Sequence, residues 1–164
     1  MLMVFKITIL ILAFLFGLLI TSIIEHNRNK PVMSFRETLD LTGLPIVTFK
    51  QGKERLNFIL DTGASKSLID SNALGNIEYE QLADTSVSYG VDGIAHETPY
   101  VGIVLNYNNK EYREAFKVMD MSSSFGILKR DYGVNVHGLL SSAFFENYAY
   151  VLDFADMIAY GKAN

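Results

Sequence analysis

The most informative segment of the chain reads Leu56-Asn57-Phe58-Ile59-Leu60-Asp61-Thr62-Gly63-Ala64-Ser65. Its apolar first half is typical of a short buried strand, and Gly63 indicates a sharp turn or the close approach of another chain. Asp61 therefore directly follows a core strand, where burial disfavours an ionised carboxylate unless water or hydrogen-bond donors reach it. This placement suggests that Asp61 has a chemical use.

A structural role for Asp61 is the simpler alternative. Asp often begins a turn by accepting hydrogen bonds from the backbone two or three residues later, here Gly63 or Ala64. The sequence beyond the turn favours a larger unit, because Ser67-Leu68-Ile69-Asp70 returns as a second apolar segment.

Taken together, these segments resemble the active-site loop of the retropepsin-like aspartic proteases. The resemblance implies that Asp61 acts with the same residue of a second chain to activate a water molecule against a peptide carbonyl. It also implies that Thr62 hydrogen-bonds across the two loops and that Gly63 lets them approach. Two carboxyls about 3 Å apart share one proton, so such a pair can act as both general base and general acid.

A hairpin is expected at Val87-Ser88-Tyr89-Gly90-Val91-Asp92-Gly93-Ile94, since Asp-Gly between strand-like runs is a strong turn signal. In the retropepsin-like family a glycine-bearing hairpin at this point covers the substrate as a flap. The resemblance therefore implies a substrate-binding set made of Ala64, Gly90, Val91, Asp92 and Gly93. An ordinary surface hairpin is the alternative.

The remaining pattern is mostly that of strands and turns. Strands are expected at residues 46–49, 101–105, 112–119, 151–154 and 158–160, with hairpin turns at 51–54 and 107–110. One short helix is expected at 141–148, with Ser141 or Ser142 as its N-cap. Residues 121–132, which contain serine and glycine, are expected to form a loop.

The carboxy-terminal segment Gly138-Leu139-Leu140-Ser141 also resembles the family, which carries Gly-apolar-apolar-Gly before a short helix. Ser141 stands where the family usually has glycine, so the packing beneath the active-site loop is expected to differ. The resemblance extends from about Pro45 to Tyr160, and Asp-Thr-Gly is its specific element.

The number of active-site motifs predicts a homodimer. A chain of 164 residues suits one domain, and it contains only the Asp-Thr-Gly at Asp61. An active protease of this kind would need its second carboxylate from another copy of the chain.

Composition excludes several other classes of protein. A net charge of −4 and a pI near 5.3 argue against a nucleic-acid surface. The absence of cysteine excludes disulfides, a cysteine nucleophile and thiolate metal sites. His26, His96 and His137 are interpreted as surface or core residues, so neither a metal nor a cofactor is expected.

The amino-terminal segment predicts a membrane anchor. Residues 7–24 carry no charge and are about as long as the shortest membrane-spanning helices. A cleaved signal peptide is the alternative, but no small-x-small cleavage site follows the apolar run. Basic residues lie on both sides, Lys6 before the span and Arg28, Lys30 and Arg36 after it, so they leave the orientation open. A single-pass membrane protein is expected.

These observations predict an all-β fold, a small closed barrel of the acid-protease kind with one short carboxy-terminal helix, preceded by one transmembrane helix. The expected divisions are an anchor at 1–24, a juxtamembrane tether and extended arm at 25–44, and a protease domain at 45–164. The expected function is hydrolysis of peptide bonds by a homodimer. The alternative is a catalytically inactive, membrane-tethered module that binds peptides or dimerises.

Overall fold

The computed structural model describes residues 11–21, 32–89 and 95–162. The chain forms two units, Met1–Lys30 and Pro31–Lys162. In the first unit, residues 11–21 form a helix with exposed apolar side chains.

The prediction of a single-pass membrane protein is wrong for the described residues, among which no helix is long and apolar enough to cross a membrane. The rest of the predicted span, residues 7–10 and 22–24, lies outside the described residues.

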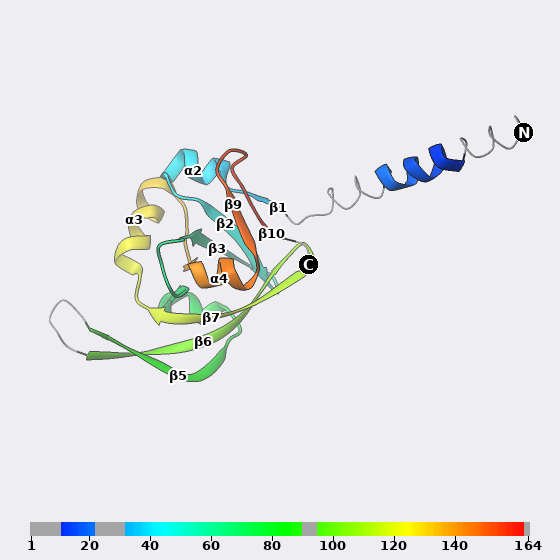
Figure 1. Cartoon of the computed structure of the whole chain (residues 1–164). Coiled ribbons are helices and arrows are strands. Elements are labelled where there is room, and N and C mark those ends of the chain that lie inside the picture. Colours follow the sequence, from blue (N-terminus) through cyan, green and yellow to red (C-terminus); the bar gives the residue numbers. More distant parts are fainter. Residues whose placement is uncertain (1–10, 22–31, 90–94, 163–164) are drawn as a thin grey trace, which may run out of the picture. The chain divides into compact units, whose positions relative to one another are not determined.

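The second unit is built on a closed six-stranded barrel, as the sequence predicts (Figure 1). Its sheet has the order β2-β3-β8-β4-β7-β6-β5: a β2–β6 pairing closes the first six strands into the barrel, and β5 is an additional strand paired with β6. The strands are β2 (Ile46–Gln51), β3 (Glu54–Leu60), β4 (Leu68–Asp70), β5 (Glu80–Tyr89), β6 (Ala95–Tyr107), β7 (Lys110–Met119) and β8 (Gly138–Leu140). The closing contact pairs Lys50 with Asn106.

Alternation of side chains along the strands fills the barrel. On β3, Leu56, Phe58 and Leu60 are buried, because successive side chains of a strand point to opposite faces. The same alternation buries Val101, Ile103 and Leu105 on β6. One face of each strand thus builds a single core.

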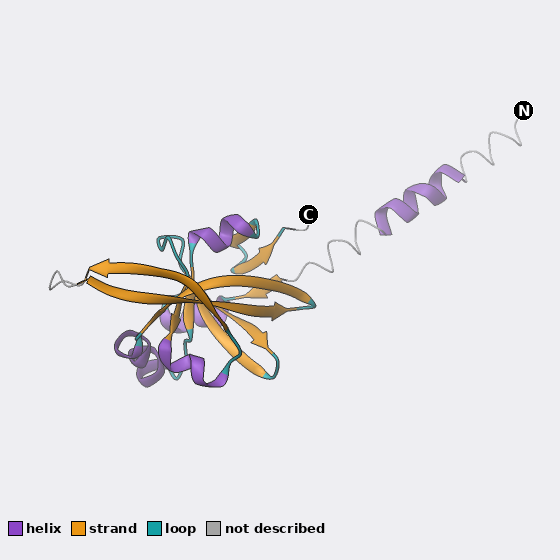
Figure 2. Ribbon diagram, turned by 90° about the horizontal axis from the view of Figure 1, so that it is seen from below, coloured by secondary structure: helices purple, strands orange, loops and turns teal. Residues whose placement is uncertain are grey.

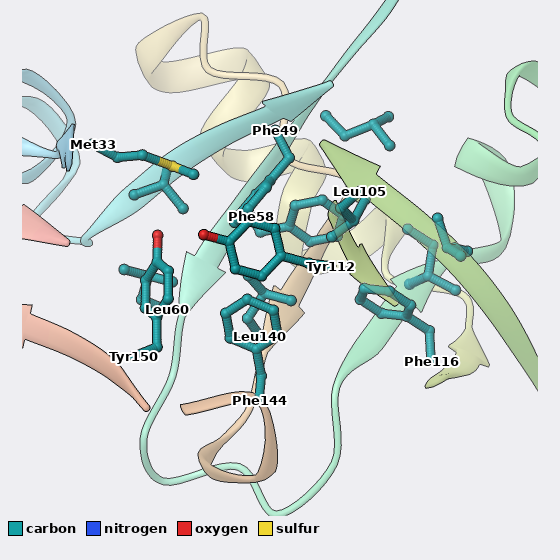
Figure 3. Packing of buried hydrophobic residues seen from close by; sticks show 14 of the residues in the cluster. Met33, Phe49, Phe58, Leu60, Leu105, Tyr112, Phe116, Leu140, Phe144 and Tyr150 are labelled. Carbon is teal, nitrogen blue, oxygen red and sulfur yellow. The ribbon is translucent and has the colours of Figure 1, made fainter. Parts of the chain in front are cut away.

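Aromatic rings occupy the centre of this core (Figure 3). Phe49 packs edge to face against Tyr112 with ring centroids 5.3 Å apart, and Phe58 stacks on Phe116 at 5.4 Å. Phe144 brings the carboxy-terminal helix into the same cluster. Edge-to-face and stacked pairs add about 0.5–1.5 kcal/mol each beyond the burial of their area.

The ends of the second unit form a separate three-stranded antiparallel sheet of order β1-β10-β9. Its strands are β1 (Val32–Ser34), β9 (Tyr150–Asp153) and β10 (Ile158–Gly161). The carboxy-terminal helix α4 (Ser142–Asn147) has Ser141, one of the two predicted residues, at its N-cap position, but the Ser141 side chain makes no capping hydrogen bond.

The fold contains more helix than the sequence predicts. The extended arm expected over residues 25–44 is wrong where α2 (Arg36–Thr42) forms. Gly43 ends this helix in the left-handed conformation, and its N–H donates to the Leu39 carbonyl. The Thr38 hydroxyl donates to the Ile46 carbonyl, and the Thr42 hydroxyl donates to the Thr38 carbonyl and accepts the Leu44 N–H, so both threonines support the helix and its exit.

The loop expected over residues 121–132 is also wrong, because Ser122–Tyr132 form helix α3. Phe125 of this helix is buried against Ile46 and Val136. Ile46 lies on β2, and α3 therefore covers apolar side chains that belong to a cluster separate from the main core of the barrel. A short 3₁₀ helix, η1 (Ser71–Asn76), occupies the connection after β4.

The β6–β7 hairpin matches its prediction, whereas the predicted β5–β6 hairpin is tested only in its strands. The β6–β7 turn places Asn108 and Asn109 at φ 49° and 64°, the left-handed values that a tight hairpin requires. β5 and β6 form a long two-stranded ribbon whose register pairs Tyr89 with Ala95 (Figure 2). The predicted turn residues between them lie outside the described residues.

Candidate active site

Asp61 lies at the end of β3, beside the strand β8. Leu60 pairs with Leu140 in parallel register, and the Asp61 N–H donates to the Leu140 carbonyl at 2.9 Å. β8 itself lies between β3 and β4, so the two strands that flank the Asp61 loop are joined through it. This arrangement fixes where the loop leaves the barrel.

The Asp61 side chain organises the turn that follows it. The Gly63 N–H donates to Asp61 Oδ1 at 2.9 Å, and the Ala64 N–H donates to the Asp61 carbonyl at 3.3 Å. The structural role considered for Asp61 is therefore present. It also orients the carboxylate, because Oδ1 is held by its own loop.

Helix α4 holds the far side of the same turn. Both the N–H and the hydroxyl of Ser142 donate to the Ala64 carbonyl at 2.9 Å. Ser142 is the first residue of α4, and Leu140, which holds Asp61, ends β8 just before it. One short segment, 140–142, therefore holds both sides of the turn.

The loop residues differ in exposure. Asp61 and Ala64 are half-buried, whereas Thr62 and Gly63 are exposed. The predicted substrate-binding residues Gly90, Val91, Asp92 and Gly93 lie outside the described residues, so the structure does not place them beside Asp61.

A buried polar cluster lies beneath the loop. Ser67, Glu114 and Ser141 are 1 %, 7 % and 0 % exposed. The Ser67 hydroxyl lies 2.7 Å from Glu114 Oε1 and 3.2 Å from Ser141 Oγ, and it accepts the Ser141 N–H at 3.1 Å. Serine in place of the family's glycine at 141 is thus accommodated by a hydrogen-bonded contact inside the fold.

Burial also affects the ionisation of this cluster. It raises the pKa of the Glu114 carboxyl above its ordinary value, while the hydrogen bond from Ser67 and the charge of Lys66 act in the opposite direction. Sequence reasoning missed Ser67 and Glu114. The sequence does carry a signal for Glu114: it alternates with Tyr112 and Phe116, which places a carboxyl on the buried face of β7.

His137 holds the backbone of β3 by a hydrogen bond. Its Nδ1 accepts the Asn57 N–H at 3.0 Å, and burial lowers the pKa of the imidazole. The part of the chain that the structure describes contains no group of three His, Cys, Asp or Glu side chains placed to bind a metal ion.

A cavity of the barrel domain lies away from Asp61. It measures about 590 Å³ and is lined by residues of β6, β7, the start of β5 and the β2–β3 turn, among them Gln51, Tyr79, Val104 and Arg113. Residues 61–65 do not line it. In a single chain, therefore, the Asp61 loop lies outside this cavity.

The closed barrel and its Asp-Thr-Gly loop define an aspartic protease-like domain. A family model described as retroviral aspartyl protease matches residues 42–140, which is more than half of the chain. The chain belongs to the retroviral aspartyl protease family. A comparison with curated protein sequences gave no match.

Proposed function

We propose that the chain is an aspartic endopeptidase that acts as a homodimer. The Asp61 carboxylates of its two chains activate the water molecule that hydrolyses the peptide bond. The observation that supports this most strongly is the loop geometry: Asp61 is oriented by Gly63 and anchored to β8, while Ala64 is held by α4. Family membership supports an aspartic protease-like function.

The chemistry requires two carboxyls that share one proton. The ionised Asp61 takes a proton from water, and the water oxygen attacks the peptide carbonyl carbon. The protonated Asp61 gives its proton to the carbonyl oxygen. Breakdown of the tetrahedral intermediate then cleaves the C–N bond: the Asp61 that took the water proton gives it to the leaving amine, and the other Asp61 takes a proton from a hydroxyl of the intermediate, which leaves one proton on the pair again.

The neighbouring residues have supporting roles in this proposal. Thr62 and Gly63 are exposed, which suits residues that meet the same loop of a second chain. Ala64 and Gly90–Gly93 would contact the peptide substrate. Closure of a β5–β6 flap would exclude water from the site.

The test is incubation of the full chain with a peptide library at mildly acidic to neutral pH, with cleavage sites read by mass spectrometry. The proposal predicts new termini with the wild type and none with Asp61→Asn. Equal cleavage by both chains would contradict the role of Asp61. Peptide binding by a folded dimer without cleavage would support a non-hydrolytic peptide-binding module instead.

A further inference from the structure

A charged residue occupies a core position of the barrel. Glu114 shares the inward face of β7 with Tyr112 and Phe116, both fully buried, and Glu114 itself is 7 % exposed. A buried carboxyl is costly unless hydrogen bonds satisfy it, and an apolar side chain would fill such a position without that cost. Its partners therefore indicate what it does.

The partners of Glu114 lead to the Asp61 loop. Ser67 lies at the downstream end of that loop, immediately before β4, and is 2.7 Å from Glu114 Oε1. Ser67 in turn contacts both the N–H and the hydroxyl of Ser141. The residues flanking Ser141 are Leu140 and Ser142, which hold Asp61 and Ala64.

We propose that Glu114, Ser67 and Ser141 form a buried positioning relay, which fixes the Asp61 loop by joining β7, the end of the loop and the start of α4. The proposal deepens the proposed function, on which its catalytic part rests. None of the three residues is assigned a contact with the reacting atoms.

The hydrogen bonds of the relay can be satisfied in either protonation state of Glu114. When Glu114 is ionised, the Ser67 hydroxyl donates to it and accepts from the N–H and the hydroxyl of Ser141. When Glu114 is neutral, the acid donates to Ser67, and the Ser67 hydroxyl donates to Ser141 Oγ. In both arrangements Ser67 makes one donated and two accepted hydrogen bonds, which is the full capacity of a hydroxyl.

The primary test is amide hydrogen exchange of the full chain, followed in peptides that cover residues 61–66 and 140–142. Ser67→Ala removes the middle of the relay with little change in volume, and Glu114→Ala removes its end. Each is expected to accelerate exchange in these segments about tenfold, while β2 (Ile46–Gln51) serves as the reference for global opening. Glu114→Gln is expected to restore near wild-type protection, since its amide can still donate to Ser67.

Glu111→Gln is the matched control. Glu111 lies on the same strand, but it is exposed and paired with Arg113 at 2.7 Å. Its substitution is expected to leave exchange in the loop unchanged. A folded Ser67→Ala chain with wild-type exchange at 61–66 would overturn the proposal, even if Glu114→Ala failed to fold.

Peptide hydrolysis gives the second readout. Ser67→Ala is expected to lower kcat about tenfold and change KM less than twofold, because the relay lies beneath the loop rather than on its exposed side. A rise in KM with unchanged kcat would contradict the positioning role. Amide hydrogen exchange can be measured without peptide hydrolysis. A wild-type chain that cleaves no peptide would therefore contradict the proposed function, while the exchange experiment would still test the relay.

Discussion

At Gly138 the barrel has no space for a side chain. A Cβ added at Gly138 would collide with the Leu68 carbonyl oxygen and lie 2.9 Å from the Phe58 ring. The Leu68 contact is with backbone, which cannot rotate away. The absence of a side chain at Gly138 therefore lets β8 pass between β3 and β4.

Gly138→Ala is expected to lower the free energy of unfolding by at least about 1–3 kcal/mol, the usual cost of overpacking a core. Chemical denaturation measures this change. Gly126→Ala is the control, because nothing lies within 4 Å of the added Cβ in α3, and alanine should stabilise that helix by up to ~1 kcal/mol. If Gly138→Ala and Gly126→Ala changed the free energy of unfolding by the same amount, the close packing at Gly138 would be contradicted.

Asp61→Asn is expected to reduce peptide hydrolysis at least about a hundredfold, since an amide can neither share a proton nor activate water. The fold should remain intact, because the amide oxygen can still accept the Gly63 N–H. Turnover and thermal unfolding of the same preparation measure both effects. Substantial remaining turnover would place the chemistry elsewhere, and a large loss of Tm would give Asp61 a mainly structural role.

Glu114 should give the stability of the fold a pH dependence. Its folded pKa is raised above the ordinary 4.5, so its contribution to stability is present below the unfolded pKa and is lost as pH rises through the folded value. The charged or titratable side chains that interact electrostatically with Glu114 are Lys66 and Tyr148. Relative to Glu114→Gln, the wild type should lose stability as pH rises from 4.5, which denaturation at a series of pH values measures. A constant difference would contradict the burial of this carboxyl.

At the scale of elements, the two long hairpins should separate catalysis from folding. Gly93→Val, at the predicted β5–β6 turn, is expected to slow hydrolysis more than it lowers Tm, since a lid completes the site but a hairpin tip buries little apolar area. Asn109→Val, at the β6–β7 turn, should do the reverse, because φ is 64° and a β-branched residue is strained there. Both variants are assayed for hydrolysis and thermal unfolding. Unimpaired hydrolysis by Gly93→Val would make the β5–β6 ribbon only structural.

At the scale of the whole molecule, activity should depend on association of two chains. The rate per chain is expected to fall on dilution once the concentration passes below the dissociation constant of the dimer. Adding a tenfold excess of Asp61→Asn chains to the wild type should lower activity about tenfold, because most wild-type chains would then pair with an inactive partner. Undiminished activity in the mixing experiment would rule out a site shared between chains.

Local patterns determined much of the fold. Short apolar runs bounded by turn residues indicate β2, β3, β6 and β7, and the Asp-Thr-Gly loop is recognisable from consecutive residues. The helix after Ser141 and the hairpin at Asn108–Asn109 are also readable, because capping and turn preferences act over a few neighbouring residues. The apolar run over residues 7–24 led to the prediction of a membrane protein, which is wrong for the part of the chain that the structure describes, because no helix there is long and apolar enough to cross a membrane.

The tertiary structure decided what depends on distant partners. Helix α3 forms from a segment that contains three serines and a glycine, because Phe125 packs against Ile46 and Val136, which are distant in the sequence. The contacts of Ser67 with Glu114 and Ser141 span 47 and 74 residues of sequence. A propensity acts between neighbours in the chain, whereas burial of a carboxyl and the hydrogen bonds that satisfy it exist only once the strands that carry them have been brought together.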